Sequence, residues 1–90
     1  MKPISFTTHA RLQMANRKAT ELEVRQAILE APWSSAEKNR LTCAMAFPFE
    51  AEHYDRYYRS KNVVPIFVEE EEEIVVITVY TFFSQKEVSK

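Results

Sequence analysis

Residues 63–83, VVPIFVEEEEEIVVITVYTFF, decide the fold, because two apolar runs flank five consecutive glutamates. Runs so rich in β-branched and aromatic residues predict strands, and Glu69–Glu73 predict the polar turn that folds them into a hairpin. Ile74–Phe83 has only Thr78 and Thr81 as polar interruptions, which is typical of a strand covered on both faces. A chain of 90 residues cannot easily cover both faces alone, so the hairpin also indicates a partner.

Size and composition predict one domain, residues 1–90, because 46 % apolar content is enough for a single core. The 12 lysines and arginines nearly balance 13 acidic residues, so no global field attracts nucleic acid. The lone Cys43 excludes an internal disulfide, which fits a reducing compartment. No apolar run reaches the roughly 18 residues of a membrane span, so we expect a soluble cytoplasmic protein without a membrane partner.

Glycine is absent from the chain. Turns that need a positive φ must therefore use Asn16, Asn39, Asn62 or neighbouring polar residues. A glycine-rich phosphate loop is impossible, which excludes P-loop and Rossmann nucleotide binding.

Two short helices are predicted in the N-terminal third, after a short strand at Ile4–Phe6. Threonines offer an N-cap for a helix over His9–Arg17. Thr20 and Glu23 form a capping box for the second helix. Its apolar residues recur at helical spacing: Val24, Ala27, Ile28 and Ala31. Pro32 ends it, and the short link makes a helical hairpin.

The period changes to two after a polar loop, Ser34–Asn39, which predicts a half-buried strand over residues 41–49. Its apolar face consists of Leu41, Cys43, Met45, Phe47 and Phe49. Glu50–Arg56 fits helix, strand or loop; we expect a loop that runs into a strand near Tyr57. Pro65 has no amide hydrogen to donate to a neighbouring strand, which predicts a kink or an edge position for its strand.

The predicted fold is α+β with the order β-α-α-β-β-β. A helical hairpin packs on one face of a small antiparallel sheet. The other face of the sheet stays available for a partner.

Several short motifs resemble a family of small bacterial proteins, domain of unknown function 4258. The opening, Thr8-His9-Ala10 followed by Met14, Arg17 and the capped helix, is similar to the family's H-A-x-x-R-M-x-x-R-G-I pattern. The two apolar runs, Val64–Val68 and Ile74–Tyr80, resemble its closing hairpin. The likeness covers most of the chain. Gln13 replaces the arginine before the methionine, and Lys18 replaces the glycine.

The resemblance implies a fold similar to RelE-type messenger-RNA interferases, the toxins of bacterial toxin–antitoxin pairs. It also implies an antitoxin as partner. In RelE-like folds the open sheet face is the RNA cleft, which makes Tyr80 a catalytic candidate. Lys18 at a left-handed position would cost about 1 kcal/mol and alter the turn between the helices.

His9 and Arg17 each have a functional and a structural interpretation. His9 is either a general base for a ribose 2′-hydroxyl or a hydrogen-bonded residue at the start of a helix. Arg17 is either a clamp for RNA phosphate or a last-turn cation that complements the helix dipole and braces the sheet.

One local cluster mixes aromatic and basic side chains, the combination that single-stranded RNA requires. It comprises Tyr54, Arg56, Tyr57, Tyr58, Arg59 and Lys61. From this cluster Arg56, Tyr57, Arg59 and Lys61 are candidate RNA-binding residues. Tyrosines are also ordinary strand residues, so the cluster has a structural interpretation as well.

The remaining chemical groups favour structural roles. Five adjacent glutamates without ligand spacing are a solvated turn rather than a metal site, and His53 has no ligand-spaced companion for zinc. Cys43 belongs to an apolar strand face, and Trp33 is expected to seal the helix–sheet interface. We therefore expect no metal and no cofactor.

Two functions remain open. The first is an RNA-directed toxin, a metal-independent endoribonuclease whose target is RNA and whose partner is an antitoxin. The second is a non-catalytic interaction module, such as a homodimer through the open face of the sheet.

Overall fold

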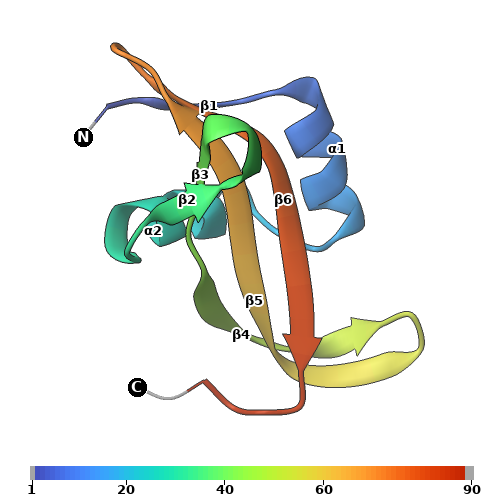
Figure 1. Cartoon of the computed structure of the whole chain (residues 1–90). Helices are drawn as coiled ribbons and strands as arrows, with labels where there is room; N and C mark the ends of the chain where they lie inside the picture. Colours follow the sequence, from blue (N-terminus) through green and yellow to red (C-terminus); the bar gives the residue numbers. More distant parts are fainter. Residues whose placement is uncertain (1, 89–90) are drawn as a thin grey trace.

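The computed structural model describes residues 2–88, which form two helices and a six-stranded sheet (Figure 1). The elements follow in the order β1 (Ile4–Phe6), α1 (Thr8–Asn16), α2 (Glu21–Glu30), β2 (Ser34–Ala36), a 3₁₀ turn (Glu37–Asn39), β3 (Arg40–Thr42), β4 (Met45–His53), β5 (Arg56–Glu69) and β6 (Ile74–Ser84). The strand order is β1-β6-β5-β3-β2, and β4 pairs with β5. The predicted α+β class is confirmed.

The sheet is mixed rather than antiparallel, because β1 pairs in parallel with the start of β6. The two helices and four strands separate these partners in sequence, so no tight turn forces them to run in opposite directions. The other strand pairs are antiparallel.

The β5–β6 hairpin forms as the two apolar runs predict. The Glu70 amide donates to the Glu73 carbonyl at 2.8 Å and closes the glutamate turn. The register shifts between Ile66 and Phe67, which leaves Ile77 as a bulge on β6. Thr7 holds this bulge, because its hydroxyl donates to the Ile77 carbonyl at 3.1 Å.

The predicted strand over residues 41–49 is divided into β3 and β4 at Cys43 and Ala44. The gap lies beside Pro65, because Thr42 pairs with Ile66 and Met45 pairs with Val63. Proline has no amide hydrogen to donate, so the ladder is interrupted there. The Thr42 hydroxyl donates to the Pro65 carbonyl at 2.9 Å instead.

Glu50–His53 is strand rather than the expected loop, since β4 extends to His53 and pairs with β5 from Arg56 onward. Tyr54 and Asp55 make the two-residue turn with φ of 51° and 64°, the left-handed pair that suits a right-handed twisted hairpin. Without glycine in the chain, polar and aromatic residues take these positions.

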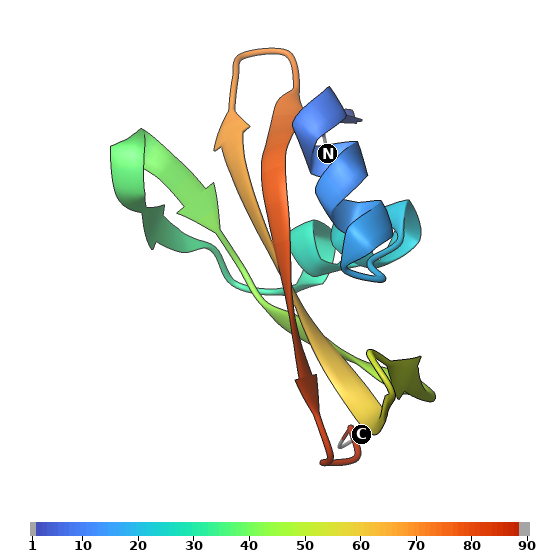
Figure 2. The ribbon, with the colours of Figure 1, turned by 90° about the vertical axis from the view of Figure 1, so that its right-hand side faces the viewer.

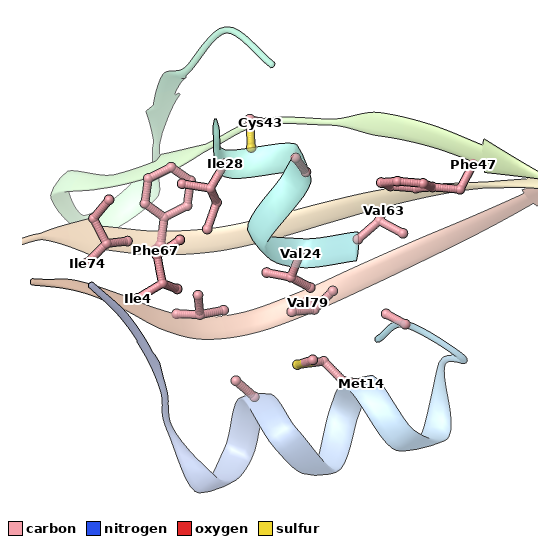
Figure 3. Close-up of a cluster of buried hydrophobic side chains, with 14 residues drawn as sticks. Ile4, Met14, Val24, Ile28, Cys43, Phe47, Val63, Phe67, Ile74 and Val79 are labelled. Carbon is pink, nitrogen blue, oxygen red and sulfur yellow. The ribbon is translucent and has the colours of Figure 1, made fainter. Parts of the chain in front are cut away.

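The core lies between the helical hairpin and one face of the sheet (Figure 3). Thr7 caps α1, and Thr20 with Glu23 forms the predicted capping box of α2. The helices present Met14, Val24 and Ile28 to Val63, Phe67 and Val79 of the sheet. Trp33 closes one end of this layer, with its ring 5.0 Å from Phe67.

Both helices lie on the same side of the sheet, and the β2–β3 hairpin stands on the opposite side (Figure 2). None of the helices in the described residues is long and apolar enough to cross a membrane.

Candidate functional site

A groove opens on the sheet face that the helices leave uncovered. The β2–β3 hairpin stands on this side of β5 and β6 (Figure 2). We call this groove the open-face groove. Its volume is about 480 Å³, and its lining residues are Ala36, Glu37, Lys38, Arg40, Ile66, Thr78 and Tyr80.

The turn between β2 and β3 brings the charged residues to the groove. Lys38 and Asn39 both have φ of 60°, the left-handed conformation that glycine usually takes in such turns. The Arg40 amide closes the turn on the Glu37 carbonyl. Two consecutive left-handed residues cost about 1 kcal/mol each or more, so the fold maintains a strained turn at this rim.

Tyr80 forms the other rim, and Arg17, which follows the end of α1, contacts its ring. Tyr80 is 43 % exposed, and the Arg17 guanidinium carbon lies 4.9 Å from the centroid of its ring. The Arg17 Nη1 donates to the Val79 carbonyl at 2.8 Å, which fixes the end of α1 to the edge of β6. The structure therefore joins a candidate RNA-binding residue and a candidate catalytic residue that lie far apart in sequence.

The groove carries a positive excess. Lys38 and Arg40 form no ion pair within 4.0 Å among residues 2–88, and Glu37 also lacks a cationic partner there. Two cations and one carboxylate line the groove, and Arg17 contacts Tyr80 of the same lining. The sequence did not identify Lys38, Arg40 or Glu37 as site residues. The one available signal was Asn39, a candidate for a left-handed turn in a chain without glycine.

The other sequence candidates lie outside the groove. His9 is exposed in the first turn of α1 and is not among the lining residues. Arg56 lies over the Tyr58 ring at 5.9 Å, and Arg59 pairs with Glu87 at 3.0 Å. Tyr57 donates its hydroxyl to Glu50, and this hydrogen bond raises the pKa of Tyr57.

Lys61 faces the helices and is 5 % exposed. Its ammonium pairs with Glu23 at 2.8 Å, donates to the Lys18 carbonyl and lies 5.3 Å from the Phe49 ring centroid. The alternation of β5 therefore divides the predicted aromatic and basic cluster between different sides of the strand.

The remaining groups have structural surroundings. Burial raises the pKa of Cys43 to about 11, which disfavours a nucleophilic thiolate. The ring of His53 stacks on Phe83 at 4.3 Å. In the part of the chain that the structure describes, His, Cys, Asp and Glu side chains nowhere gather in threes around a possible metal ion.

Compared with protein families, residues 6–81 match a model described as a domain of unknown function (DUF4258). Comparison with curated proteins and with solved structures yields no match. The match extends from the end of β1 into β6 and includes all the residues that line the open-face groove.

Proposed function

The chain belongs to the family described as domain of unknown function DUF4258, and we propose that this member binds single-stranded RNA in the open-face groove as the toxin of a toxin–antitoxin pair. We also propose that the fold of this protein is related to that of RelE-type messenger-RNA interferases. An antitoxin is then the protein partner that controls it.

One observation carries the proposal: Tyr80 lines the groove together with Lys38 and Arg40, and the Arg17 guanidinium lies over its ring. An aromatic ring offers a platform for an unpaired base, and neighbouring cations neutralise the phosphates on either side. Arginine in particular bonds phosphate with two parallel donors. The groove opens to solvent rather than forming an enclosed cavity, which is compatible with a polymeric ligand.

The groove also holds groups for cleavage without a metal. A ribose 2′-oxygen would bond to the adjacent phosphorus while the bond from phosphorus to the 5′-oxygen breaks. The Glu37 carboxylate would take the proton of the 2′-hydroxyl, and the Tyr80 hydroxyl would protonate the departing 5′-oxygen. Arg17 and Arg40 would stabilise the extra negative charge on the phosphate.

His9 and Lys61 take no part in this arrangement. His9 lies outside the residues that line the groove, and the Lys61 ammonium already has Glu23 and the Lys18 carbonyl as partners. Arg56, Tyr57 and Arg59 are candidates for a second contact further along the RNA.

Induced expression in bacteria tests the proposal. We expect the wild type to arrest growth, and Tyr80→Phe to relieve the arrest while it keeps the ring on which a base stacks. Tyr54→Phe is the matched control, because Tyr54 is 86 % exposed on the β4–β5 turn, away from the groove. Harmless expression of the wild type, together with intact RNA after incubation with the purified protein, would contradict the proposal.

A second candidate function is a non-catalytic interaction module. Phe82, on the same strand as Tyr80, is 59 % exposed, and Val64, Ile66 and Val75 on the uncovered face are only partly buried. Partly exposed apolar side chains on one sheet face are typical of a surface that another protein covers. An inert protein that forms a stable complex with a partner or with itself would favour this function.

A further inference from the structure

The backbone of β6 offers unpaired hydrogen-bonding groups at its outer edge. Successive residues of a strand point their amide and carbonyl groups to opposite sides. The Pro65 carbonyl accepts a hydrogen bond from the Thr42 hydroxyl, so the backbone carbonyl of Pro65 points away from β6. Val79 lies opposite Pro65, and its backbone amide and carbonyl therefore point away from β5. The bond from Arg17 to the Val79 carbonyl agrees with this assignment. By alternation, Thr81 and Phe83 also direct their amides and carbonyls to the outer edge.

The N-terminal part of this edge is occupied. β1 pairs with β6 at Ile74–Val76, Thr7 bonds to Ile77, and Arg17 bonds to Val79. β1 ends there, and the remaining part of β6 pairs with β5 alone (Figure 1). Within residues 2–88, no hydrogen bond reaches the outward groups of Thr81 or Phe83.

This free edge lacks the usual protection against pairing. Exposed edges are commonly blocked by a charged side chain, a proline or a bulge. Ile74–Ser84 contains neither a charged residue nor a proline, and its bulge at Ile77 lies before the free part. Like charges within the strand therefore do not oppose the approach of an identical edge.

We propose that a second copy of this chain pairs with this edge, antiparallel and centred on Thr81, so that the two sheets become one. A two-fold axis at Thr81 lets each Thr81 amide donate to the carbonyl of the other copy's Thr81. It also places Phe82 of each copy directly opposite Tyr80 of the other, on the uncovered face. The pairing is argued from the edge of β6 and not from the proposed RNA chemistry, although Tyr80 belongs to both.

The exposed aromatic residues support a second copy as the occupant. Tyr80 and Phe82 are 43 % and 59 % exposed in the single chain. Neighbours in a non-hydrogen-bonded antiparallel pair have their Cα atoms about 4.5 Å apart, so the two rings would meet across the strands. Each dimer would contain two such pairs. The Val79 carbonyl already accepts a hydrogen bond from Arg17, so the segment that pairs with the second copy ends there.

Sedimentation equilibrium of the full chain tests the proposal. We expect a concentration-dependent dimer that Phe82→Lys weakens at least about tenfold, since two lysines replace the two aromatic contacts. Thr81→Pro should weaken it similarly, because the amide it removes points outward and makes no bond to β5. Tyr54→Lys, a change at an exposed aromatic residue of the β4–β5 turn, should leave the dimer unchanged.

Hydrogen exchange separates edge pairing from contact through the open face. The Thr81 amide should exchange more slowly in concentrated than in dilute protein, whereas contact between faces would leave its rate unchanged. A strict monomer at high concentration would overturn the proposal. So would a dimer that keeps its affinity in both Phe82→Lys and Thr81→Pro.

Discussion

Lys61 of β5 and Glu23 of α2 form an ion pair across the helix–sheet interface, with 2.8 Å between Nζ and Oε1. The same carboxylate accepts the Thr20 amide at 3.0 Å in the capping box. Lys61 also donates to the Lys18 carbonyl, so one buried ammonium connects the turn between the helices to the sheet. The residue that the sequence offered as an RNA ligand thus holds the helical hairpin in place.

The first prediction concerns this ion pair. Lys61→Ala should lower the free energy of unfolding by about 3 kcal/mol, because it leaves the partly buried Glu23 carboxylate without its cation. Arg59→Ala is the control: it removes an exposed pair with Glu87 and should cost about 0.5 kcal/mol or less. Urea denaturation measures both changes, and equal losses in the two variants would show that the buried pair has no special weight.

The second prediction concerns Lys18, which has φ of 60°. Lys18→Gly should raise the free energy of unfolding by about 1 kcal/mol, because glycine takes the left-handed conformation without strain. Ala15→Gly is the matched control in the last turn of α1, where glycine should cost up to about 1 kcal/mol. Thermal unfolding of the two variants should shift in opposite directions; a lower midpoint for Lys18→Gly would refute the assignment.

The third prediction compares the two helix caps. Thr20→Ala should cost about 1 kcal/mol, the usual value for loss of an N-cap. Thr7→Ala should cost more, since the Thr7 hydroxyl accepts from the Ala10 amide and also donates to the Ile77 carbonyl. Thr7→Ser keeps both hydrogen bonds, so its free energy of unfolding, measured by chemical denaturation, should be close to that of the wild type. If the two alanine variants are equally stable, the bond to the bulge contributes nothing.

The fourth prediction concerns Cys43, whose pKa burial raises from 9.0 to about 11. Above pH 9 the thiol of the unfolded chain ionises while the folded thiol keeps its proton, so the unfolded state is favoured as pH rises. Cys43 should therefore reduce the free energy of unfolding by about 2 kcal/mol between pH 9 and pH 11. Lysines and tyrosines also titrate there, so the slope is compared with that of Cys43→Ala, which should be shallower. Parallel slopes would exclude this contribution.

Local signals in the sequence predicted the elements that depend on neighbouring residues. The capping box of Thr20 and Glu23 begins α2 as expected, and the two apolar runs form the β5–β6 hairpin. The break between β3 and β4 was missed, because it depends on Pro65 lying beside Cys43 and Ala44 in the folded sheet. The parallel pairing of β1 was also missed, because it depends on contact with β6, a strand far away in the sequence.

The candidate site was less predictable than the fold. Tyr80 and Arg17 were identified separately, but their contact joins β6 to the end of α1 and has no local signature. Lys38 and Arg40 enter the groove because a left-handed turn places β2 and β3 beside the open face. The register of β5 determines the side on which Lys61 lies. That register was not predicted, because Glu50–Arg56 could be either loop or strand.

Binding of single-stranded RNA to the purified protein, measured by fluorescence anisotropy at low salt, tests the central claim most directly. We predict that Arg40→Ala weakens binding about tenfold, as expected for loss of a charge-assisted contact to phosphate worth about 1.4 kcal/mol. Lys86→Ala, which removes an equal charge from an exposed position outside the open-face groove, should have little effect. No binding by the wild type, or equal losses in the two variants, would contradict the account.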